Sequence, residues 1–466
     1  MELPLIRDLH VLQLEQYWVS RYAVWVFKHF FNFSPLTKTK LKETYKIKAL
    51  MLAYILALAI IYFLLIRFIS LAVAIGLFVI FNIWPVFVLA PTMFLIQKLE
   101  VVILLLIKTI YRNKLLGYKK LTRIGITGSF GKSSVKNFLD AILSKSSYCV
   151  KTPSSYNTVL GIIKVIQMEI LSKVRYFIIE MGAFKKGDIT ELCYLTKPEW
   201  GILTAVGKQH LERFGSVERV LKTKFELVDT IADKSKVLVN GDNEEICKFI
   251  EGKKRYERLK RYSRKDKKAD FFVSGVKMSG VKTSFFVTYK SKKYKFESGL
   301  FGSSNIENLV AAIGMSLMLG IEIKQIKRAV TDLKPAKNRL EIKKMGKAWV
   351  IDNTYSSNEE GFKRLIADIK KVRGVKALIT PGIVELGKET KSVHQILGKM
   401  AADVFDEIVL VGESDRTRSF QVGIGRSNKK TKMWFLEDFA DYWVTVEKLA
   451  KKYKWILLEN DLPENY

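Results

Sequence analysis

Thiol and imidazole side chains are scarce in this sequence, which has three cysteines and four histidines among 466 residues. The cysteines, Cys149, Cys193 and Cys247, are odd in number and far apart. This pattern excludes a disulfide framework and a zinc site built on paired cysteines, and it fits a reducing compartment. We expect all three cysteines to be buried small hydrophobic residues.

Acidic residues are few as well: 46 Asp and Glu stand against 78 Lys and Arg, which gives a formal charge of +32. A charge of this size indicates nucleic acid, an anionic membrane surface or an anionic substrate as the partner. The sequence lacks zinc-finger spacing, an RNA-recognition signature and a basic heptad region, so we expect no nucleic acid. The first apolar block lies too deep in the chain for a cleavable signal peptide, and we expect none.

Two long uncharged runs, Ala49–Ile66 and Phe68–Gln97, are the most prominent feature that is present. Each reaches the ~18 apolar residues of a membrane span, and a helix in a soluble core is seldom hydrophobic on every side. The second run contains Asn82, Pro85 and Pro91, so we expect it to tilt, kink or end early. Basic residues crowd both outer flanks, which places both ends in the cytoplasm. The sequence therefore predicts a two-span hairpin in the cell membrane, with membrane lipid as a partner.

The sequences of the segments on either side of the hairpin predict less about their structure. Residues 1–46 mix aromatic and basic residues, which fits equally an amphipathic helix on the membrane surface and a helix packed on the spans. Val101–Tyr118 is apolar and basic, and we interpret it as an interfacial helix. A third span there would place the rest of the chain outside the cell unless one run were re-entrant.

A glycine-rich motif lies between the apolar run 124–126 and a helical pattern at 135–143. It consists of Thr127, Gly128, Ser129, Phe130, Gly131, Lys132, Ser133 and Ser134. Such a turn between strand and helix aims backbone N–H groups and the helix dipole at one point, so it binds phosphate. Lys132 would reach the β- and γ-phosphates of ATP, and the Ser133 hydroxyl would reach Mg²⁺. Because Ile126 stands where the usual motif has glycine, an ordinary strand–helix turn is the alternative.

From residue 121 onward, apolar strand-like runs alternate with helical patterns, which predicts an α/β fold with mostly parallel sheets. We expect strands at 123–127, 176–180, 200–205, 236–239, 348–352, 377–380, 407–411 and 455–458. Short alternating runs such as 285–289 predict antiparallel strands inserted at a sheet edge. The expected parts are an N-terminal segment (1–46), a membrane hairpin with its interfacial helix (47–120), an ATP-binding central domain (121–334) and a smaller Rossmann-like C-terminal domain (335–466).

Two polar residues follow predicted strands, where open α/β sheets bind their ligands. Glu180 ends one strand and could hold Mg²⁺, which prefers oxygen ligands. His210 lies just past another strand. Taken singly, each is more often a structural residue than a ligand, so only their combination with the phosphate loop carries weight.

Nine sequence blocks follow one another in the order typical of the Mur ligase family, the ATP-dependent amide ligases of peptidoglycan precursor synthesis. They are residues 127–133, 156–162, 180–182, 210–215, 222–226, 239–243, 302–308, 337–340 and 352–358. The chain resembles this family over about residues 121–460, and within it the type that adds D-alanyl-D-alanine.

The resemblance implies two metal sites, with Mg²⁺ as the expected ion. Ser133 and Glu180 would hold one Mg²⁺, and His210 would ligate a second metal. Lys224 matches the family's lysine that carries a carbamate, which turns a cation into a metal-bridging anion. An unmodified surface lysine is the alternative at that position.

The resemblance also implies contacts with ATP. Asn305 and Asn308 would contact the adenine side, Arg339 the γ-phosphate and Asp352 the ribose. Asn157 would lie beside the phosphate in transfer. Lys132 and Arg339 would neutralise charge while an acyl phosphate forms on a carboxylate acceptor and an amine donor then displaces the phosphate.

Three departures from the family pattern concern the substrates. The predicted hairpin stands where family members carry a soluble domain that grips the UDP part of their substrate, so the acceptor would be lipid-anchored or polymeric, or otherwise not UDP-linked. Ser304 replaces a histidine on the adenine side. Residues 457–463 replace a lysine-glycine-serine pattern near the incoming amine, which leaves the amine open.

We therefore expect a membrane-anchored ligase of cell-envelope precursor synthesis, with its catalytic domains in the cytoplasm. A ligase for another envelope polymer, of the poly-γ-glutamate type, is the second hypothesis. A non-catalytic, nucleotide-binding membrane scaffold is the third. A scaffold needs no metal sites, so the presence of six residues argues against it: Lys132, Glu180, His210, Lys224, Arg339 and Asp352.

Overall fold

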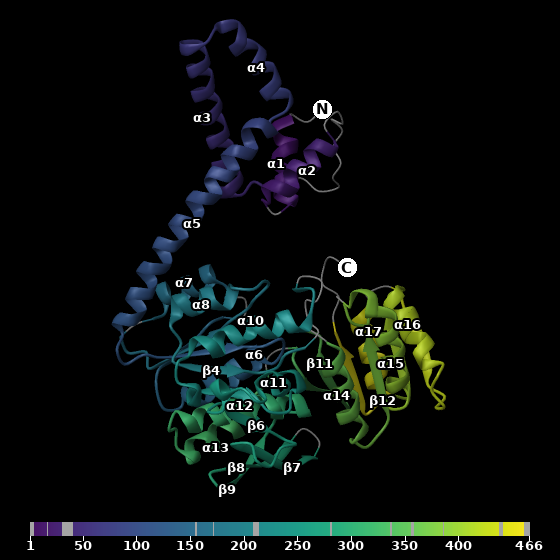
Figure 1. Ribbon diagram of the computed structural model, residues 1–466. Coiled ribbons are helices and arrows are strands. Elements are labelled where there is room, and N and C mark those ends of the chain that lie inside the picture. The colour runs from purple at the N-terminus through teal and green to yellow at the C-terminus, as the bar shows by residue number, and fades with distance from the viewer. Residues whose placement is uncertain are drawn as a thin grey trace. The chain divides into compact units, whose positions relative to one another are not determined.

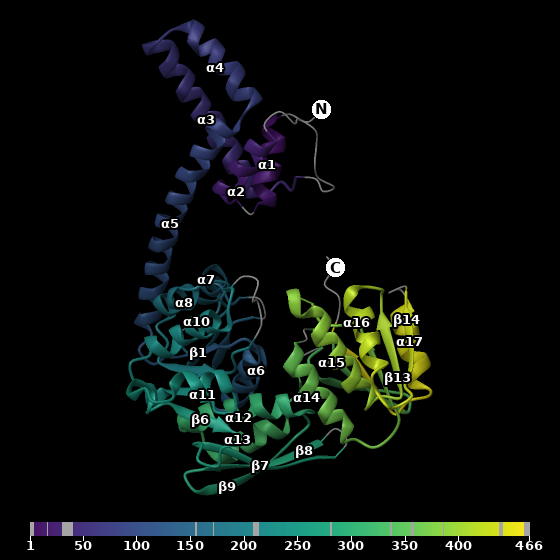
Figure 2. The ribbon, with the colours of Figure 1, turned by 45° about the vertical axis from the view of Figure 1, so that its right-hand side comes forward.

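The computed structural model describes residues 4–15, 17–29, 41–153, 156–170, 172–207, 214–279, 282–335, 338–355, 358–384, 386–437 and 441–460. The chain forms two compact units, residues 1–110 and 111–466. Figure 1 labels their helices and strands, and Figure 2 gives a second view.

The first unit is helical throughout its described part. Its helices are α1 (Pro4–Leu14), α2 (Val19–Lys28), α3 (Tyr45–Phe68), α4 (Leu71–Ile83) and α5 (Val86–Gly117), which continues into the second unit. Side chains of α1 and α2 pack on the N-terminal turns of α3 and α5, in a core around Leu9, Tyr22, Leu50 and Leu89. Of the two interpretations of residues 1–46, helices packed on the hydrophobic segments are the one observed.

In the described residues, one helix, α3, is long and apolar enough to cross a membrane. Helices α4 and α5 pass the same test only as a pair, and they bend by 76° at the break between them. The break falls at Trp84 and Pro85, because proline lacks the N–H of a helical hydrogen bond and disfavours helical conformation at the residue before it. The predicted interruption of the second apolar run is thus confirmed.

The expected helix at 101–118 is present as far as Gly117, although it is not a separate element, and its interfacial position stays a prediction. That segment is the C-terminal half of α5, which runs from Val86 to Gly117 with Pro91 inside it. No further glycine or proline interrupts the helix before Gly117, so helical hydrogen bonding continues from the apolar run into the basic segment.

The apolar side chains of α3 are largely uncovered. In the described structure its buried residues are Ile47, Leu50 and Tyr54, all near its start, while Phe63 and Ile66 are more than half exposed. A core helix of a soluble protein would be covered by other elements, so this exposure favours a membrane environment over a protein core. That two spans cross a membrane stays a prediction.

The second unit begins with a sheet of nine strands in the order β2-β3-β1-β4-β5-β6-β7-β8-β9. The strands are β1 (Thr122–Thr127), β2 (Cys149–Lys151), β3 (Tyr176–Glu180), β4 (Trp200–Leu203), β5 (Val237–Asn240), β6 (Lys260–Ser263), β7 (Phe271–Ser279), β8 (Lys282–Tyr289) and β9 (Lys292–Ser298). Strands β2 to β7 pair in parallel, whereas β8 is antiparallel to both β7 and β9. The antiparallel insertion expected at a sheet edge is confirmed.

Helices cover both faces of this sheet (Figure 1). They are α6 (Lys132–Leu143), α7 (Val159–Met168), α8 (Asp188–Thr196), α10 (Val217–Thr230), α11 (Glu244–Ile250), α12 (Ser303–Met318) and α13 (Ile323–Thr331). Helices α6, α12 and α13 share a core with Ile124 and Ile126 of β1. On the opposite face, a Cβ at Gly125 would lie 2.8 Å from Leu227, so glycine at that position lets α10 pack closely on the sheet.

A second sheet of six strands follows, in the order β10-β11-β15-β12-β13-β14. The strands are β10 (Glu341–Met345), β11 (Ala348–Asn353), β12 (Lys376–Thr380), β13 (Glu407–Val411), β14 (Lys432–Leu436) and β15 (Trp455–Glu459), and the helices are α14 (Glu359–Lys370), α15 (Thr390–Ala402), α16 (Asp415–Ile424) and α17 (Tyr442–Ala450). Only β10 pairs antiparallel among these described strands. Leu457 faces α14 to α16 and Ile456 faces α17, as alternation along a buried strand requires.

The predicted α/β fold with mostly parallel sheets is confirmed. Each expected strand is found within two residues of its predicted ends; β4, for example, ends at Leu203. The expectation of three buried cysteines holds for Cys193 alone, since Cys149 begins edge strand β2 and Cys247 lies on a short surface helix, and both are half-buried. The domain boundaries at 46, 120 and 334 stay predictions.

Candidate active site

The glycine-rich motif forms the turn between β1 and α6, at the C-terminal edge of the parallel strands. Gly131 caps α6 with φ 85°, a left-handed conformation that glycine adopts without strain. A Cβ at this position would collide with Oδ1 of Asn308, and one at Gly128 would collide with Oγ1 of Thr204. The tight turn aims the N–H groups of the loop and of the first turn of α6 at one point, as phosphate binding requires.

Hydrogen bonds from neighbouring strands fix the loop. Thr204 Oγ1 donates to the carbonyl of Phe130 at 2.5 Å, and the N–H of Gly207 donates to Ser129 Oγ at 3.1 Å. Thr127 Oγ1 donates to the carbonyl of Met181 at 3.0 Å. The hydroxyl of Thr127 is therefore engaged with the end of β3, while Gly128, Ser129 and Gly131 of the loop line the adjoining cavities.

Lys132 folds back over the loop that precedes it. Its Nζ donates to the carbonyls of Gly128 at 2.7 Å and Ser129 at 3.1 Å. Burial lowers the pKa of Lys132 to about 8, the positive charge of Arg339 adds to this effect, and Glu180 opposes it. An anion bound at the loop would raise the pKa of this buried amine and so keep it fully protonated.

Glu180 is the centre of a buried polar cluster at the end of β3. Its Oε1 accepts a hydrogen bond from Ser133 Oγ at 3.0 Å, and its backbone N–H donates to Thr152 Oγ1 at 3.0 Å. Lys136 Nζ lies 2.9 Å from Oε2, and both side chains are at most 4 % exposed. The two groups form an ion pair without the geometry of a hydrogen bond. Oε2 therefore accepts no hydrogen bond within the described residues.

Lys224 projects from α10 into a small cavity that it shares with the phosphate loop. Gly128, Ser129, Lys132, Asn157, Gly182, Ala183, Phe184, Phe214, Val220 and Lys224 line this cavity. Lys224 is 4 % exposed. Burial and then the charge of Lys132 lower its pKa to about 7, against the opposing effect of Asp188 and Glu226. The alternative of an ordinary surface lysine is wrong, because α10 packs this side chain inward.

Asn157 lies at the same cavity, where the turn before α7 meets the residues after β3. The backbone carbonyl of Asn157 accepts a hydrogen bond from the N–H of Gly182 at 3.1 Å. A Cβ at Gly182 would lie 2.9 Å from the Asn157 amide, so glycine makes room for that side chain. The structure therefore gathers Lys132, Asn157 and Lys224, predicted from separate sequence blocks, around one space.

A second cavity, of about 120 Å³, lies beside the loop and is lined by residues of both sheets' domains. Asn305, Asn308 and Arg339, all predicted site residues, line it together with Gly131 and Ser134. Asn305 Nδ2 donates to the carbonyl of Phe301 at 3.0 Å. The guanidinium of Arg339 lies over the ring of Tyr355, with its Cζ 3.9 Å from the ring centroid.

Asp352 is a predicted site residue that the structure leaves out of this cavity. Its Oδ2 lies 3.1 Å from Lys343 Nζ on β10, and its Oδ1 accepts hydrogen bonds from the N–H and hydroxyl of Thr354. The cavity is lined instead by Asn353 and Asn358 of the same sequence block. Successive side chains on a strand point to opposite faces, so the neighbour of Asp352 occupies the place expected for it.

Two further features escaped prediction from the sequence. Glu307 accepts hydrogen bonds from Asn240 at 2.5 Å and from Arg364 at 2.6 Å, which joins the central sheet to α14 across the cavity. Lys136, the partner of Glu180, lies on α6 one turn after Lys132. A lysine among apolar helix positions is an ordinary surface pattern, so only the tertiary structure identifies this one as buried.

Some predicted features lie outside the described residues. They are His210 with Leu211, Glu212 and Arg213, then Lys337, Ser356 and Ser357, and Asp461 to Pro463. The predicted second metal ligand therefore remains a prediction. Among the described residues, no group of three His, Cys, Asp or Glu side chains is arranged to hold a metal.

Residues 126–316 match the family model described as the Mur ligase middle domain. The central part of the chain is therefore similar to the corresponding domain of the Mur ligases. Members of this family are ATP-dependent carbon–nitrogen ligases.

Two curated relatives carry the name UDP-N-acetylmuramoyl-tripeptide–D-alanyl-D-alanine ligase. The protein of Buchnera aphidicola subsp. Acyrthosiphon pisum is 29% identical over 320 residues, 68% of this chain and 70% of its own length. That of Escherichia coli is 26% identical over 330 residues, 70% of each chain.

Solved structures share the fold of this chain. The MurF ligase from Thermotoga maritima in complex with ADP has a TM-score of 0.68 at 22% identity and covers 77% of this chain and 80% of its own. MurF from Acinetobacter baumannii has a TM-score of 0.67 at 21% identity, with 77% of each chain covered.

Gly131→Ala should weaken nucleotide binding by this protein. The left-handed φ and the collision with Asn308 would deform the loop. A strain of about 1–2 kcal/mol, if it falls on the binding-competent loop, predicts a loss of about five- to thirtyfold in ADP affinity. Fluorescence titration with a labelled ADP measures it.

Gly187→Ala is the matched control, because Gly187 caps α8 with φ 94° and a Cβ there would meet no atom within 4 Å. Gly187→Ala should lower the free energy of unfolding by a similar amount and leave the ADP affinity unchanged. Equal losses of affinity in the two variants would contradict a phosphate-binding role for the loop.

Proposed function

We propose that this protein uses ATP to join a carboxylate acceptor to an amine donor through an acyl phosphate, in the synthesis of a cell-envelope precursor. The observation that carries the proposal is the convergence of Lys132, Asn157 and Lys224 on one cavity at the phosphate loop. A scaffold that merely retained the fold would gain nothing from two buried lysines with lowered pKa values, since each disfavours folding in its charged form.

We place the nucleotide along the loop and the adjoining cavity. The phosphates would accept hydrogen bonds from the N–H groups of Gly131, Lys132 and Ser133, and Asn305 and Asn308 would lie on the adenine side. Arg339 would reach the γ-phosphate, and its position over Tyr355 keeps the guanidinium at the cavity. For the ribose, Asn353 and Asn358 are better placed than Asp352, because they line the cavity.

The residues around Glu180 fit a divalent cation. The carboxylate is buried, its Oε2 pairs by charge with Lys136 at 2.9 Å but accepts no hydrogen bond among the described residues, and a serine hydroxyl stands beside it, so a bound cation would share Oε2 with this ammonium or displace it. Hard cations such as Mg²⁺ take such oxygen ligands. Ser133 and Glu180 would hold the ion, which would neutralise phosphate charge when bound. A second ion would use His210, outside the described residues, and Lys224.

Lys224 is suited to carry a carbamate. Carbamate forms from CO₂ and a neutral amine, and a pKa of about 7 makes a large fraction of this amine neutral near physiological pH. Its neighbour Lys132 offers a positive charge to the resulting anion. Burial in the cavity would then shield the carbamate from water.

The protein's own residues would mainly position and neutralise. An acceptor carboxylate would attack the γ-phosphorus of ATP, and ADP would leave. The amine would next attack the acyl carbon, and phosphate would leave through a tetrahedral intermediate. Lys132 and Arg339 would stabilise charge on the transferred phosphoryl group, while Asn157 would hydrogen-bond beside it.

The relatives' names suggest the substrates. Those proteins are named for a UDP-linked muramoyl tripeptide and D-alanyl-D-alanine. We propose a UDP- or lipid-linked muropeptide, or a similar carboxylate, as acceptor, and D-alanyl-D-alanine or another amino compound as donor. We also propose that α3 to α5 anchor the chain in the cell membrane, with residues 121–334 and 335–466 as cytoplasmic domains.

Acceptor-stimulated phosphate release tests the proposed reaction. The full chain in nanodiscs would be given ATP, Mg²⁺ and pairs drawn from UDP-linked and lipid-linked muropeptides, glutamate and D-alanyl-D-alanine. Release with one pair, together with an amide product seen by mass spectrometry, supports the ligase. Stimulation by glutamate oligomers alone would favour a polymer ligase. ADP binding without release for any pair would favour the scaffold.

Glu180→Gln should weaken metal binding at least about tenfold, since it removes the charge that the cation needs and keeps the shape. Electron paramagnetic resonance of Mn²⁺, titrated in the presence of ADP, measures this without turnover. Glu169→Gln, on the exposed end of α7, is the control and should bind Mn²⁺ as the unaltered chain does. Unchanged Mn²⁺ affinity in Glu180→Gln would contradict the assignment.

A further inference from the structure

The exposed apolar side chains of the central domain gather in one part of its sequence. Among described residues 111–334, the large hydrophobic side chains that are exposed are Leu116, Tyr148, Leu160, Met168 and Phe184. All five precede residue 185. Scattered single exposures are normal on a soluble domain, whereas a cluster confined to one region indicates an interaction surface.

Hydrogen bonds bring several of these segments together in space. The hydroxyl of Tyr118 donates to the carbonyl of Ile170, the N–H of Arg175 donates to the carbonyl of Tyr148, and the Arg175 guanidinium donates to the carbonyl of Lys120. Strand β2, which begins beside Tyr148, is the edge strand paired with β3. These contacts join the end of α5, the start of β2 and the C-terminal end of α7. The residues after β3 lie at the other end of α7, where the N–H of Gly182 donates to the backbone carbonyl of Asn157. We name the surface that runs along α7 between these two ends the β2-side face.

On this face, helix α7 exposes a row of apolar and basic side chains to solvent. Leu160, Lys164 and Met168 are spaced by four residues and are all exposed, while Ile162, Ile163, Val165 and Ile166 are buried on the other side. Figures 1 and 2 both show α7 next to α8, at the side of the domain where α5 arrives.

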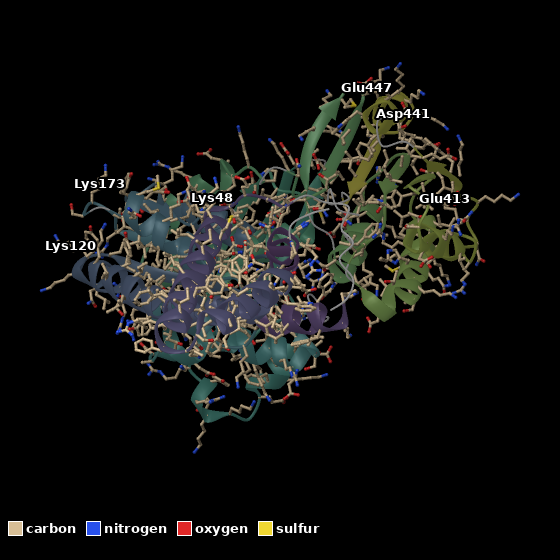
Figure 3. The ribbon with its side chains drawn as sticks, turned by 90° about the horizontal axis from the view of Figure 1, so that it is seen from above. Lys48, Lys120, Lys173, Glu413, Asp441 and Glu447 are labelled. Carbon is tan, nitrogen blue, oxygen red and sulfur yellow. The ribbon has the colours of Figure 1, made fainter. Side chains whose placement is uncertain are left out.

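Positive charge is concentrated on the same stretch. Residues 111–186 contain fourteen Lys and Arg and three Asp and Glu. Lys120 and Lys173 extend outward on the same side of the central domain in Figure 3, and Lys173 Nζ lies 4.6 Å from the ring centroid of Tyr148. Aliphatic and aromatic side chains interleaved with lysines suit the headgroup region of an anionic bilayer, where the former insert shallowly and the latter meet phosphate.

We propose that the β2-side face rests on the headgroups of an anionic membrane. The inference rests on the proposed membrane location of α3 to α5, and chain continuity supports it: fewer than ten residues separate Ile110, in the exposed apolar part of α5, from Lys119 on this face. An anchor so close raises the effective concentration of lipid at the face.

A consequence concerns the route of the acceptor. Phe184 is half exposed on the β2-side face and also lines the cavity of Lys132 and Lys224. The entrance to that cavity would lie beside the lipid, so an acceptor carried on a lipid would reach the reacting groups without leaving the membrane surface.

Lipid-dependent quenching of a probe on α7 tests the proposal. The full chain, with Cys149→Ser, Cys193→Ala, Cys247→Ser and Met168→Cys, would carry a bimane label at position 168. It would be placed in nanodiscs of phosphatidylcholine alone or with about one third phosphatidylglycerol, both containing headgroup-region spin-labelled lipid. We expect at least about twofold stronger quenching with phosphatidylglycerol, reduced by raised salt because screening weakens the attraction.

Charge reversals provide the comparison. K120E/K164E/K173E should remove the phosphatidylglycerol-dependent quenching, whereas K254E/K267E/K292E makes the same charge change at exposed lysines elsewhere in the domain and should preserve it. Equal quenching in the two lipids, or equal loss in both variants, would overturn the proposal and leave a protein or a nucleic acid as the partner of this face. The assay contains no ATP, so its failure is separate from failure of the ligase reaction.

Discussion

We expect Lys132→Met to lower acceptor-dependent phosphate release at least about a hundredfold in kcat, since comparable losses follow removal of one charged or hydrogen-bonding group aimed at developing charge. Methionine keeps the length of the side chain and removes the charge. Lys132 lies against the carbonyls of Gly128 and Ser129, where its ammonium would face the transferred phosphoryl group. A phosphate-release assay with the best substrate pair measures the change.

Lys145→Met is the matched control for this variant. Lys145 follows α6 in the turn after it, is about half exposed and pairs with Asp332 at the surface. Surface pairs of this kind contribute about 0–1 kcal/mol, so phosphate release should be unchanged. If Lys132→Met kept full turnover while ADP still bound, the loop would serve binding alone and the proposed reaction would fail.

The second large effect is expected at Lys224. Lys224→Arg should lose at least about a hundredfold in phosphate release, because a guanidinium cannot form the carbamate and adds a buried charge. Removing bicarbonate and CO₂ should lower the activity of the unaltered chain, and adding bicarbonate should restore it. ¹³C NMR after incubation with ¹³C-bicarbonate would detect the carbamate carbon directly.

The pH dependence of this modification has a definite sign. With a pKa of about 7, the neutral amine increases as pH rises from 6 to 8, so carbamate formation should increase over the same range. An ordinary lysine, with a pKa of about 10.4, would be less than about 1% neutral throughout that range. A carbamate signal that fell with rising pH, or that was equal in Lys224→Arg, would contradict the assignment.

The same pKa affects the stability of the unmodified protein. The folded-state pKa of about 7 lies below the value of 10.5 for a free lysine, so the unfolded chain binds more protons between these values. The free energy of unfolding should therefore rise with pH through this window, by at most about 1.4 kcal/mol per pH unit for one group. In Lys224→Met this part of the slope should be absent, whereas Lys222→Met, at an exposed position two residues away, should retain it.

Much of the candidate site follows from local sequence. Glycine spacing at 128 and 131 predicts a turn that only glycine can make, and the structure has φ 85° at Gly131. Glu180 ends a buried strand, and strand ends at one edge of a parallel sheet lie close together. These features depend on neighbours in the chain, which is why periodicity and turn chemistry were sufficient to predict them.

Other parts of the site depend on contacts between residues far apart in the chain. Lys136 meets Glu180, 44 positions later, only because α6 packs beside β3. Arg364 meets Glu307 only because α14 faces α12. The prediction for Asp352 missed the cavity by one residue for the same reason. Neighbouring strand residues point to opposite faces of the sheet, and only the tertiary structure shows which face meets the cleft.

The amino-acid sequence by itself determined the α/β rhythm, the strand positions, the phosphate loop and the uncharged runs near the N-terminus, because each is a pattern among residues close together along the chain. Only the tertiary structure decided that Lys224 is buried beside Lys132, that Asn353 and not Asp352 lines the cleft, and that the second apolar run breaks at Pro85 and then continues as one long helix. The difference is physical: burial, pKa and cavity lining arise from packing between distant segments, and the order of residues does not specify that packing locally.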